Sequence, residues 1–169
     1  MASNKSAAVS GSCACGAVTY VSQSLPEQVQ HCNCVTCRKL SGGPFMTFGD
    51  FKAEDVRFSS GDVQVDVTSN AIEKSQGSFQ AFQVSKVAIR GACKSCHSPM
   101  SMWYFHMPES IGIPLGSVDE ESLADAEARR SLQAEAHIFA DQRVGWYNID
   151  KDSLPTHARF TEQWHPPGA

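Results

Sequence analysis

The chain reads Cys13-Ala14-Cys15 near its start, then Cys32-Asn33-Cys34-Val35-Thr36-Cys37, and later Cys93-Lys94-Ser95-Cys96. On an extended strand, alternate side chains share a face, so the C-x-C spacing brings two sulfurs together, while a C-x-x-C turn converges two sulfurs on one point. Structural zinc is held by four protein ligands, whereas catalytic zinc keeps three and leaves the fourth place for water or substrate. Seven cysteines therefore divide naturally into a closed site of four and an open site of three.

Disulfide bonding is the alternative use of these cysteines. An odd number would leave one thiol over, and two cysteines one residue apart form a strained pair. Residues 1–5 have no apolar stretch resembling a signal peptide, and no run of about 18 apolar residues is present to cross a bilayer. We expect a cytoplasmic protein with no membrane partner, in a reducing compartment where thiolates stay available to metal.

Length and charge limit the number of domains and the kinds of partner that we expect for this chain. A chain of 169 residues with 41% hydrophobic residues is expected to form one domain with its own core, which metal binding would supplement. Fourteen Lys and Arg stand against eighteen Asp and Glu, for a formal net charge of −4, and no basic cluster could neutralise several phosphates. We expect no nucleic-acid partner, and the sequence leaves a homo-oligomer open.

Short β-type patterns dominate the chain and predict strands at 16–21, 27–34, 45–48, 63–67, 79–84, 87–92, 99–105, 137–139 and 144–149. Residues 36–44 are expected to form a loop or short helical turn. Residues 119–135 are rich in Ala, Glu and Arg and predict a surface helix with Asp119 as a possible N-cap. The pattern indicates one mainly β domain over 11–160, with mobile tails at 1–10 and 161–169.

Four segments together resemble the glutathione-dependent formaldehyde-activating enzyme family, to which centromere protein V domains also belong: Gly11-Ser12-Cys13-Ala14-Cys15-Gly16, His31 to Arg38, Cys93-Lys94-Ser95-Cys96, and His137-Ile138-Phe139 with Trp146. The resemblance covers roughly residues 10 to 160. It implies a zinc-supported β-tent of two or three small antiparallel sheets with one short surface helix. It also implies two Zn²⁺ per chain, a structural ion on Cys13, Cys15, Cys93 and Cys96 and a catalytic ion on Cys32, Cys34 and Cys37.

The family reaction joins the sulfur of glutathione to the carbon of formaldehyde and gives S-hydroxymethylglutathione. The resemblance therefore implies a carbon-sulfur lyase that acts on a small-molecule thiol or thiol adduct, with glutathione as co-substrate. Three thiolates on Zn²⁺ leave a net charge of −1, which weakens the metal as a Lewis acid toward water but permits exchange of a fourth ligand. Thiol chemistry thus fits this site better than hydrolysis does.

Residues that follow the three-cysteine cluster are candidates for substrate contact. Arg38 and Lys39 could receive a carboxylate of a glutathione-like substrate, or they could simply offset the negative charge of the thiolates. Ser41, Gly42 and Gly43 could let a substrate approach backbone N–H groups, although Gly-Gly before proline is also a common turn. Arg38, Ser41 and Gly42 are therefore the predicted substrate-binding residues.

Histidines and aromatic residues near the clusters have alternative roles as well. His31 precedes a ligand on a strand, so packing or an outer hydrogen bond is expected rather than direct chemistry. His97 or His137 could complete the open zinc site and close it. Three aromatic residues are expected either to line a pocket or to pack in the core, namely Trp103, Phe105 and Trp146.

Two further functions compete with the lyase. A binding or structural protein of the centromere protein V type would use zinc to hold the domain, but this chain has no long basic or Pro-rich extension. A redox enzyme of the methionine sulfoxide reductase type needs a free cysteine of low pKa, and none remains if all seven bind metal. The fourth ligand of the second zinc and any thiol dependence of binding distinguish the first two functions.

Overall fold

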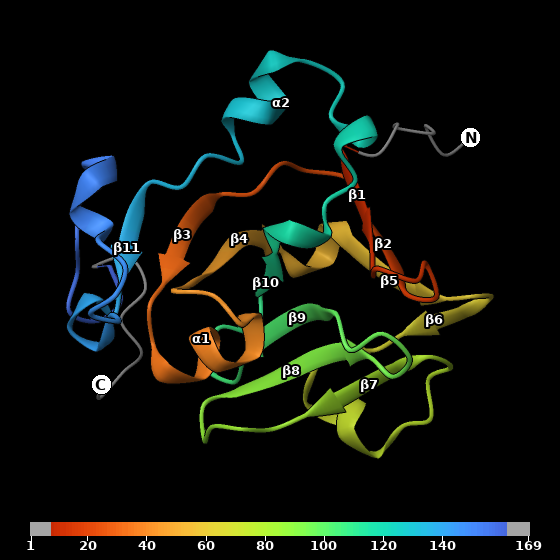
Figure 1. The fold of residues 1–169 in the computed structure, drawn as a ribbon. Coiled ribbons are helices and arrows are strands. Elements are labelled where there is room, and N and C mark those ends of the chain that lie inside the picture. Colours follow the sequence, from red (N-terminus) through yellow and green to blue (C-terminus); the bar gives the residue numbers. More distant parts are fainter. Residues whose placement is uncertain (1–7, 162–169) are drawn as a thin grey trace.

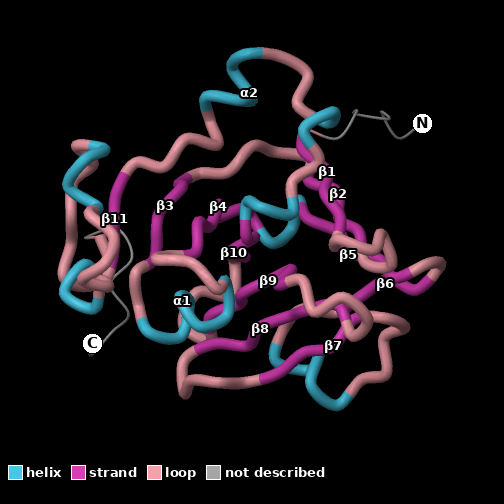
Figure 2. Tube along the Cα trace, viewed as in Figure 1, coloured by secondary structure: helices cyan, strands magenta, loops and turns pink. Residues whose placement is uncertain are grey.

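The fold is mainly β and is built from two sheets, as a computed structural model of residues 8–161 shows (Figures 1 and 2). The smaller sheet is antiparallel and has the order β1-β2-β5-β6. Its strands are β1 (Val9–Ser12), β2 (Thr19–Ser22), β5 (Val56–Ser60) and β6 (Val63–Val65). The expectation of a mainly β fold is confirmed.

The larger sheet has seven strands in the order β11-β3-β4-β10-β9-β8-β7. Its members are β3 (Gln28–Cys32), β4 (Met46–Lys52), β7 (Phe79–Phe82), β8 (Ala88–Cys93), β9 (Pro99–Tyr104), β10 (Ser110–Pro114) and β11 (Ala136–Ile138). β11 pairs with β3 in parallel, whereas the other neighbours are antiparallel. The sheet is thus larger than the small antiparallel sheets that the resemblance implies, and it is mixed.

Within residues 8–161, two α-helices and six short 3₁₀ helices lie between the strands or after the last of them. The α-helices are α1 (Val35–Ser41) and α2 (Ala126–Arg130). The 3₁₀ helices are η1 (Ala53–Asp55), η2 (Ser69–Glu73), η3 (Leu115–Ser117), η4 (Glu120–Ser122), η5 (Ala140–Gln142) and η6 (Ile149–Asp152). No helix within residues 8–161 is long and apolar enough to cross a bilayer.

The helix predicted over 119–135 is wrong in its length, and Asp119, although it stands at the N-cap position of η4, makes no side-chain capping hydrogen bond. The segment forms only η4 and the five-residue α2, and Asp125 is the cap, since its carboxylate accepts from the backbone N–H groups of Glu127 and Ala128. Asp119 is engaged elsewhere, because its carboxylate accepts a hydrogen bond from the Ser12 hydroxyl at 2.9 Å. Tertiary contacts with the first strand thus override the local helix propensity.

The strand predicted at 144–149 is also wrong. The chain runs there from η5 to η6 through a loop, and Trp146 is 72% exposed instead of packing in the core. Tyr147 lies edge-on to the Phe45 ring, with centroids 5.8 Å apart. This loop packs locally and adds no strand to the sheet.

The ends of the described region belong to the domain. β1 begins at Val9, which is fully buried, so residues 9 and 10 of the expected tail are part of a sheet. Thr161 is buried, and its hydroxyl accepts a hydrogen bond from the Gln30 amide. The remainder of both predicted tails, 1–7 and 162–169, lies outside the described residues.

Two apolar clusters form the core, and each contains cysteines. The larger packs Tyr20, Phe51, Phe79 and other buried side chains around Cys13 and Cys93. The smaller contains Cys32 and Cys37 together with Met46, Phe48, Ala88, Met102 and Ile138. The cysteine sites are therefore built into the core, so their geometry and the packing of the domain depend on each other.

Candidate metal centres

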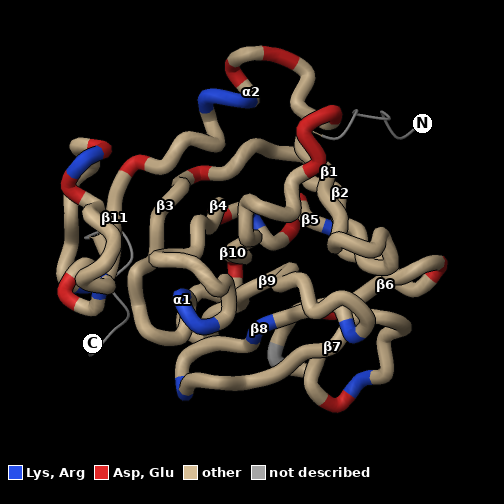
Figure 3. Tube along the Cα trace, viewed as in Figure 1, with Lys and Arg blue, Asp and Glu red and all other residues tan. Residues whose placement is uncertain are grey.

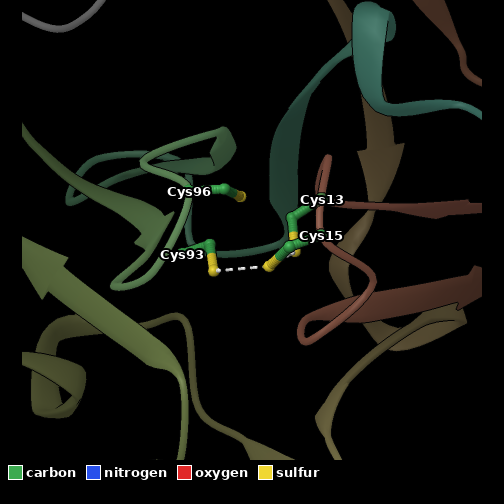
Figure 4. A group of neighbouring side chains, drawn as sticks. All are labelled: Cys13, Cys15, Cys93 and Cys96. Atoms are coloured by element: carbon green, nitrogen blue, oxygen red, sulfur yellow. Dashed lines mark hydrogen bonds between the residues drawn. The ribbon is translucent and has the colours of Figure 1, made fainter.

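Four cysteines from two distant loops meet at one point. Cys13 and Cys15 follow β1, while Cys93 ends β8 and Cys96 lies in the turn before β9 (Figure 4). Their four sulfurs lie within 4.8 Å of one another, with 3.6 Å between Cys13 and Cys15 and 3.7 Å between Cys15 and Cys93. A disulfide would require about 2.05 Å, so these thiols are not bridged.

The geometry of this group fits zinc. Tetrahedral Zn–S bonds of about 2.3 Å place the sulfurs about 3.8 Å apart, close to the observed separations. The backbone N–H of Val18 donates to the Cys13 sulfur at 3.2 Å and, against the opposing effect of burial, lowers the pKa of that thiol. The Ser98 hydroxyl lies 3.2 Å from the Cys96 sulfur and lowers its pKa to about 5. Neutral donors thus support thiolate at Cys13 and Cys96. Against the lowering effect of a backbone hydrogen bond from Ala17, contacts with the Cys13 and Cys96 thiols raise the pKa of Cys15 to about 11.

The other three cysteines meet at the start of α1. Cys32 ends β3, Cys34 is the N-cap of α1, and Cys37 lies in its first turn, where its N–H donates to the Cys34 sulfur at 3.4 Å. The three sulfurs lie within 4.8 Å of one another. Cys32 and Cys37 are buried and Cys34 is half-buried, so the group is reached from the Cys34 side. The structure therefore gathers the seven cysteines into the groups of four and three that their spacing predicts.

The three sulfurs share negative charge. Hydrogen bonds from the Cys32 and Cys37 thiols lower the pKa of Cys34 to about 2. The contact with Cys34 raises the pKa of Cys32 well above its ordinary value, and the pKa of Cys37 is raised to about 11. A dication can replace the two shared protons, so this donor set also suits a thiophilic metal such as zinc.

Arg90 on β8 reaches this group and was missed by the sequence analysis. Its side chain is 7% exposed, and its Nη2 donates to the Cys37 sulfur at 3.3 Å. Burial opposes the charge, but the electrostatic attraction of the Cys37 sulfur and its hydrogen bond raise the pKa of Arg90 above its usual value. The signal in the sequence is one charged residue within the apolar run 87–92, just before a cysteine pair.

A small cavity of about 10 Å³ adjoins Cys32. It has room for about one water molecule. Its polar lining includes Asp50 and Tyr104, and its other walls are largely apolar: Gln30, Phe48, Met102, Ile138 and Phe160. Burial raises the pKa of Asp50 to about 8 and that of Tyr104 well above its ordinary value. Neither residue was singled out by the sequence.

No histidine completes the three-cysteine group within residues 8–161. His137 is buried between Asn33, whose amide nitrogen lies 3.2 Å from Nδ1, and Asp152, whose carboxylate lies 2.8 Å from Nε2. His31 lies 2.8 Å from the Thr47 hydroxyl and packs on the Phe45 ring, which agrees with its expected packing role. His97 is exposed beside the four-cysteine group.

The three predicted substrate-binding residues lie at the end of α1, and the structure gives each a local role. Arg38 is half-buried and its Nε donates to the Asn33 carbonyl at 3.0 Å. Gly42 has φ 71°, which favours glycine, and its N–H donates to the Arg38 carbonyl, so it caps the helix. The Ser41 hydroxyl donates to the Phe45 carbonyl at 3.0 Å. Their contact with substrate stays a prediction.

Comparisons with known proteins identify one matching family. The family model for glutathione-dependent formaldehyde-activating enzymes matches residues 8–142. A crystal structure of a Rhodobacter sphaeroides protein matches with 20% sequence identity and a TM-score of 0.48, over 69% of this chain and 95% of that one. No curated protein sequence matches at a significant level.

Proposed function

Because this chain belongs to the glutathione-dependent formaldehyde-activating enzyme family, we propose that it is a zinc-dependent carbon-sulfur lyase acting on a glutathione-type thiol adduct. The observation that carries the proposal is the three-cysteine group, which gains no fourth His, Cys, Asp or Glu ligand from residues 8–161. A closed structural site needs four ligands, and the same chain already holds one such set. The contrast between the two groups favours an open, reactive site.

The reaction joins a thiol to a carbonyl compound. The sulfur forms a bond to the carbonyl carbon, the π electron pair moves to oxygen, and that oxygen takes up the proton that the thiol has lost. Cys32, Cys34 and Cys37 would hold a zinc ion, which would accept a thiol as a further ligand and lower the pKa of that thiol. No oxidant or reductant is required, in either direction.

The protein shields the three-cysteine group from solvent and determines the side from which the reacting atoms approach it. Cys32 and Cys37 are nearly inaccessible to solvent, so the reacting atoms approach beside the half-buried Cys34. The walls near Cys32 are mostly apolar, which excludes bulk water and strengthens electrostatic interactions. Asp50 and Tyr104 provide the ionisable oxygen groups of this cavity, beside the Gln30 amide, and burial raises the pKa of both, which keeps Asp50 in its neutral form near neutrality.

Glutathione carries two carboxylates, and basic residues near the site suit them. The last turn of α1 carries Arg38 and Lys39, visible as the blue segment of this helix in Figure 3. An open groove of about 590 Å³ passes Ser41, but its one charged lining residue is Asp119. In this proposal the substrate carboxylates bind to Arg38 and Lys39, and Ser41 and Gly42 lie beside them at the same helix end. The proposal includes two Zn²⁺ per chain and a reducing, cytoplasmic setting.

Exchange spectroscopy tests the function. Isotope-labelled formaldehyde is mixed with glutathione, and the rate of exchange between free aldehyde and S-hydroxymethylglutathione is measured by NMR with and without protein. Acceleration by the zinc-loaded chain, lost in Cys34→Ser, supports the lyase. A panel of thiols and larger aldehydes identifies the preferred pair. Rates equal to the uncatalysed background for every pair would overturn the lyase in favour of the non-catalytic, zinc-stabilised binding module.

A further inference from the structure

The three-cysteine group has a buried cation beside it, whereas the four-cysteine group does not. Arg90 is the one basic side chain that a hydrogen bond joins to a cysteine sulfur within residues 8–161. At the four-cysteine group the corresponding donors are the Val18 N–H and the Ser98 hydroxyl, which are neutral. The chain therefore holds two thiolate sites that differ in counter-charge.

The buried Arg90 guanidinium makes few stabilising contacts apart from its hydrogen bond to Cys37. Its side chain is 7% exposed, and its Nε is buried with no hydrogen-bond partner among the described residues. A buried guanidinium is costly unless an anion compensates it. The Cys37 sulfur lies 3.3 Å from Nη2 and would be that anion once it ligates zinc, and the Phe48 ring, 5.9 Å from the guanidinium carbon, adds a weak cation-π contact.

The sheet fixes Arg90 in place. β8 is an inner strand, and Arg90 pairs with Phe82 of β7 on one side and with Met102 of β9 on the other. All six residues of β8 are buried. The guanidinium is therefore held beside the three cysteine sulfurs before a ligand binds, so binding requires no reorganisation free energy to bring the charge into position.

We propose that Arg90 is the counter-charge of the three-cysteine site, and that it makes this site selective for an anionic thiolate as the incoming ligand. Three thiolates, one Zn²⁺ and one guanidinium sum to zero, so an incoming thiolate meets a neutral centre instead of one of charge −1. Arg90 acts through Cys37 and is a positioning residue. Selection of a thiolate rests on the proposed function, whereas the counter-charge itself does not.

Metal affinity tests the counter-charge without any assay of turnover. Zinc is titrated into the full-length chain against a chromophoric chelator, which resolves the two sites, for wild type, Arg90→Gln and Arg90→Lys. Arg90→Gln should weaken zinc at the three-cysteine site by about 10- to 100-fold, as loss of an outer-shell partner commonly does. The four-cysteine site is the internal control and should keep its affinity. Arg90→Lys keeps the charge and should recover most of the loss.

Ligand binding tests the selectivity. Cobalt-loaded protein is titrated with glutathione and, as a neutral ligand, with imidazole, and the ligand-field bands of the three-cysteine site are followed. Arg90→Gln should weaken glutathione by about tenfold or more and leave imidazole unchanged, as expected for loss of one buried charge-assisted contact. Equal weakening of both ligands would overturn the selectivity.

The remaining outcomes separate the inference from the proposed function. Equal loss of zinc at both sites in Arg90→Gln, or no loss at either, would overturn the counter-charge. If Arg90→Gln does not fold, Arg90→Met, which also removes the charge but keeps an unbranched side chain, decides: a loss confined to the three-cysteine site supports the inference, and a loss shared by both sites or absent from both contradicts it. Site-selective zinc loss in a chain that shows no thiol-aldehyde exchange would keep the counter-charge and remove the lyase.

Discussion

Asp50 is a buried carboxyl group whose replacement should change how stability depends on pH. It lies on β4, is 6% exposed, and takes part in no ion pair within residues 8–161. Burial, with a smaller effect of the nearby Glu27 charge, raises the pKa of Asp50 from 3.8 to about 8. Asp50→Asn keeps the shape of the side chain and removes the ionisation.

The direction in which the free energy of unfolding changes with pH follows from proton binding by Asp50. Between pH 3.8 and about 8 the folded protein retains a proton that the unfolded chain has released, so the stability of the wild type falls as pH rises through this window. At about 1.4 kcal/mol per pKa unit, the whole interval corresponds to on the order of 5 kcal/mol. Asp50→Asn lacks this titration. Relative to wild type, the variant should gain stability steadily from about pH 4 to pH 8 and then no further.

Urea unfolding of the zinc-loaded chain at a series of pH values between 5 and about 9 measures this gain. Both proteins are compared at each pH, because zinc affinity itself changes with pH. Asp62→Asn is the matched control, since Asp62 is exposed and its charge stays hydrated in both states, so that variant should follow the wild type. A difference between Asp50→Asn and wild type that does not vary with pH would refute the reasoning.

Three further predictions concern the cysteines, a close contact in the sheet and the exposed loop. Cys93→Ser should lose one zinc ion and unfold the domain, because it removes a ligand within the larger core cluster. Cys34→Ser should lose the other zinc ion and keep a cooperative unfolding transition. Metal analysis with thermal unfolding checks both variants, and unfolding of both to the same extent would contradict the division of the cysteines into groups of four and three. Gly91→Ala should destabilise the chain by about 1–3 kcal/mol in urea, because a Cβ there collides with the Phe79 ring; an unchanged midpoint would show that the ring moves freely. Trp146→Ala should change stability by less than about 0.5 kcal/mol, since this side chain is 72% exposed, and a larger loss would place it in a packed interface.

The cysteine groups were predictable because their geometry is local. Cys13 and Cys15 are joined by a short loop, and Cys34 and Cys37 by the first turn of α1, and each spacing already directs two sulfurs to one point. The division into four and three then follows from the number of ligands that zinc takes. What the spacing leaves undecided is which strands carry the pairs together, and pairing across the sheets supplies that.

Other features depend on contacts between residues far apart in the chain. Arg90 reaches Cys37 across 53 positions, and Asp50 becomes buried through pairing with Gln28 on one side and Gly112 on the other. Neither environment is visible in a local pattern. The helix over 119–135 failed for the same reason, because the Asp119 side chain is held by the first strand instead of capping a helix.

Zinc stoichiometry with X-ray absorption at the zinc edge tests the central claim, that one site is closed and the other accepts a thiol. Protein purified without added metal should contain two zinc ions per chain, with an average sulfur coordination of about 3.5 that rises toward 4 when glutathione is added. A single zinc ion per chain, or a fully closed coordination that glutathione leaves unchanged, would contradict it.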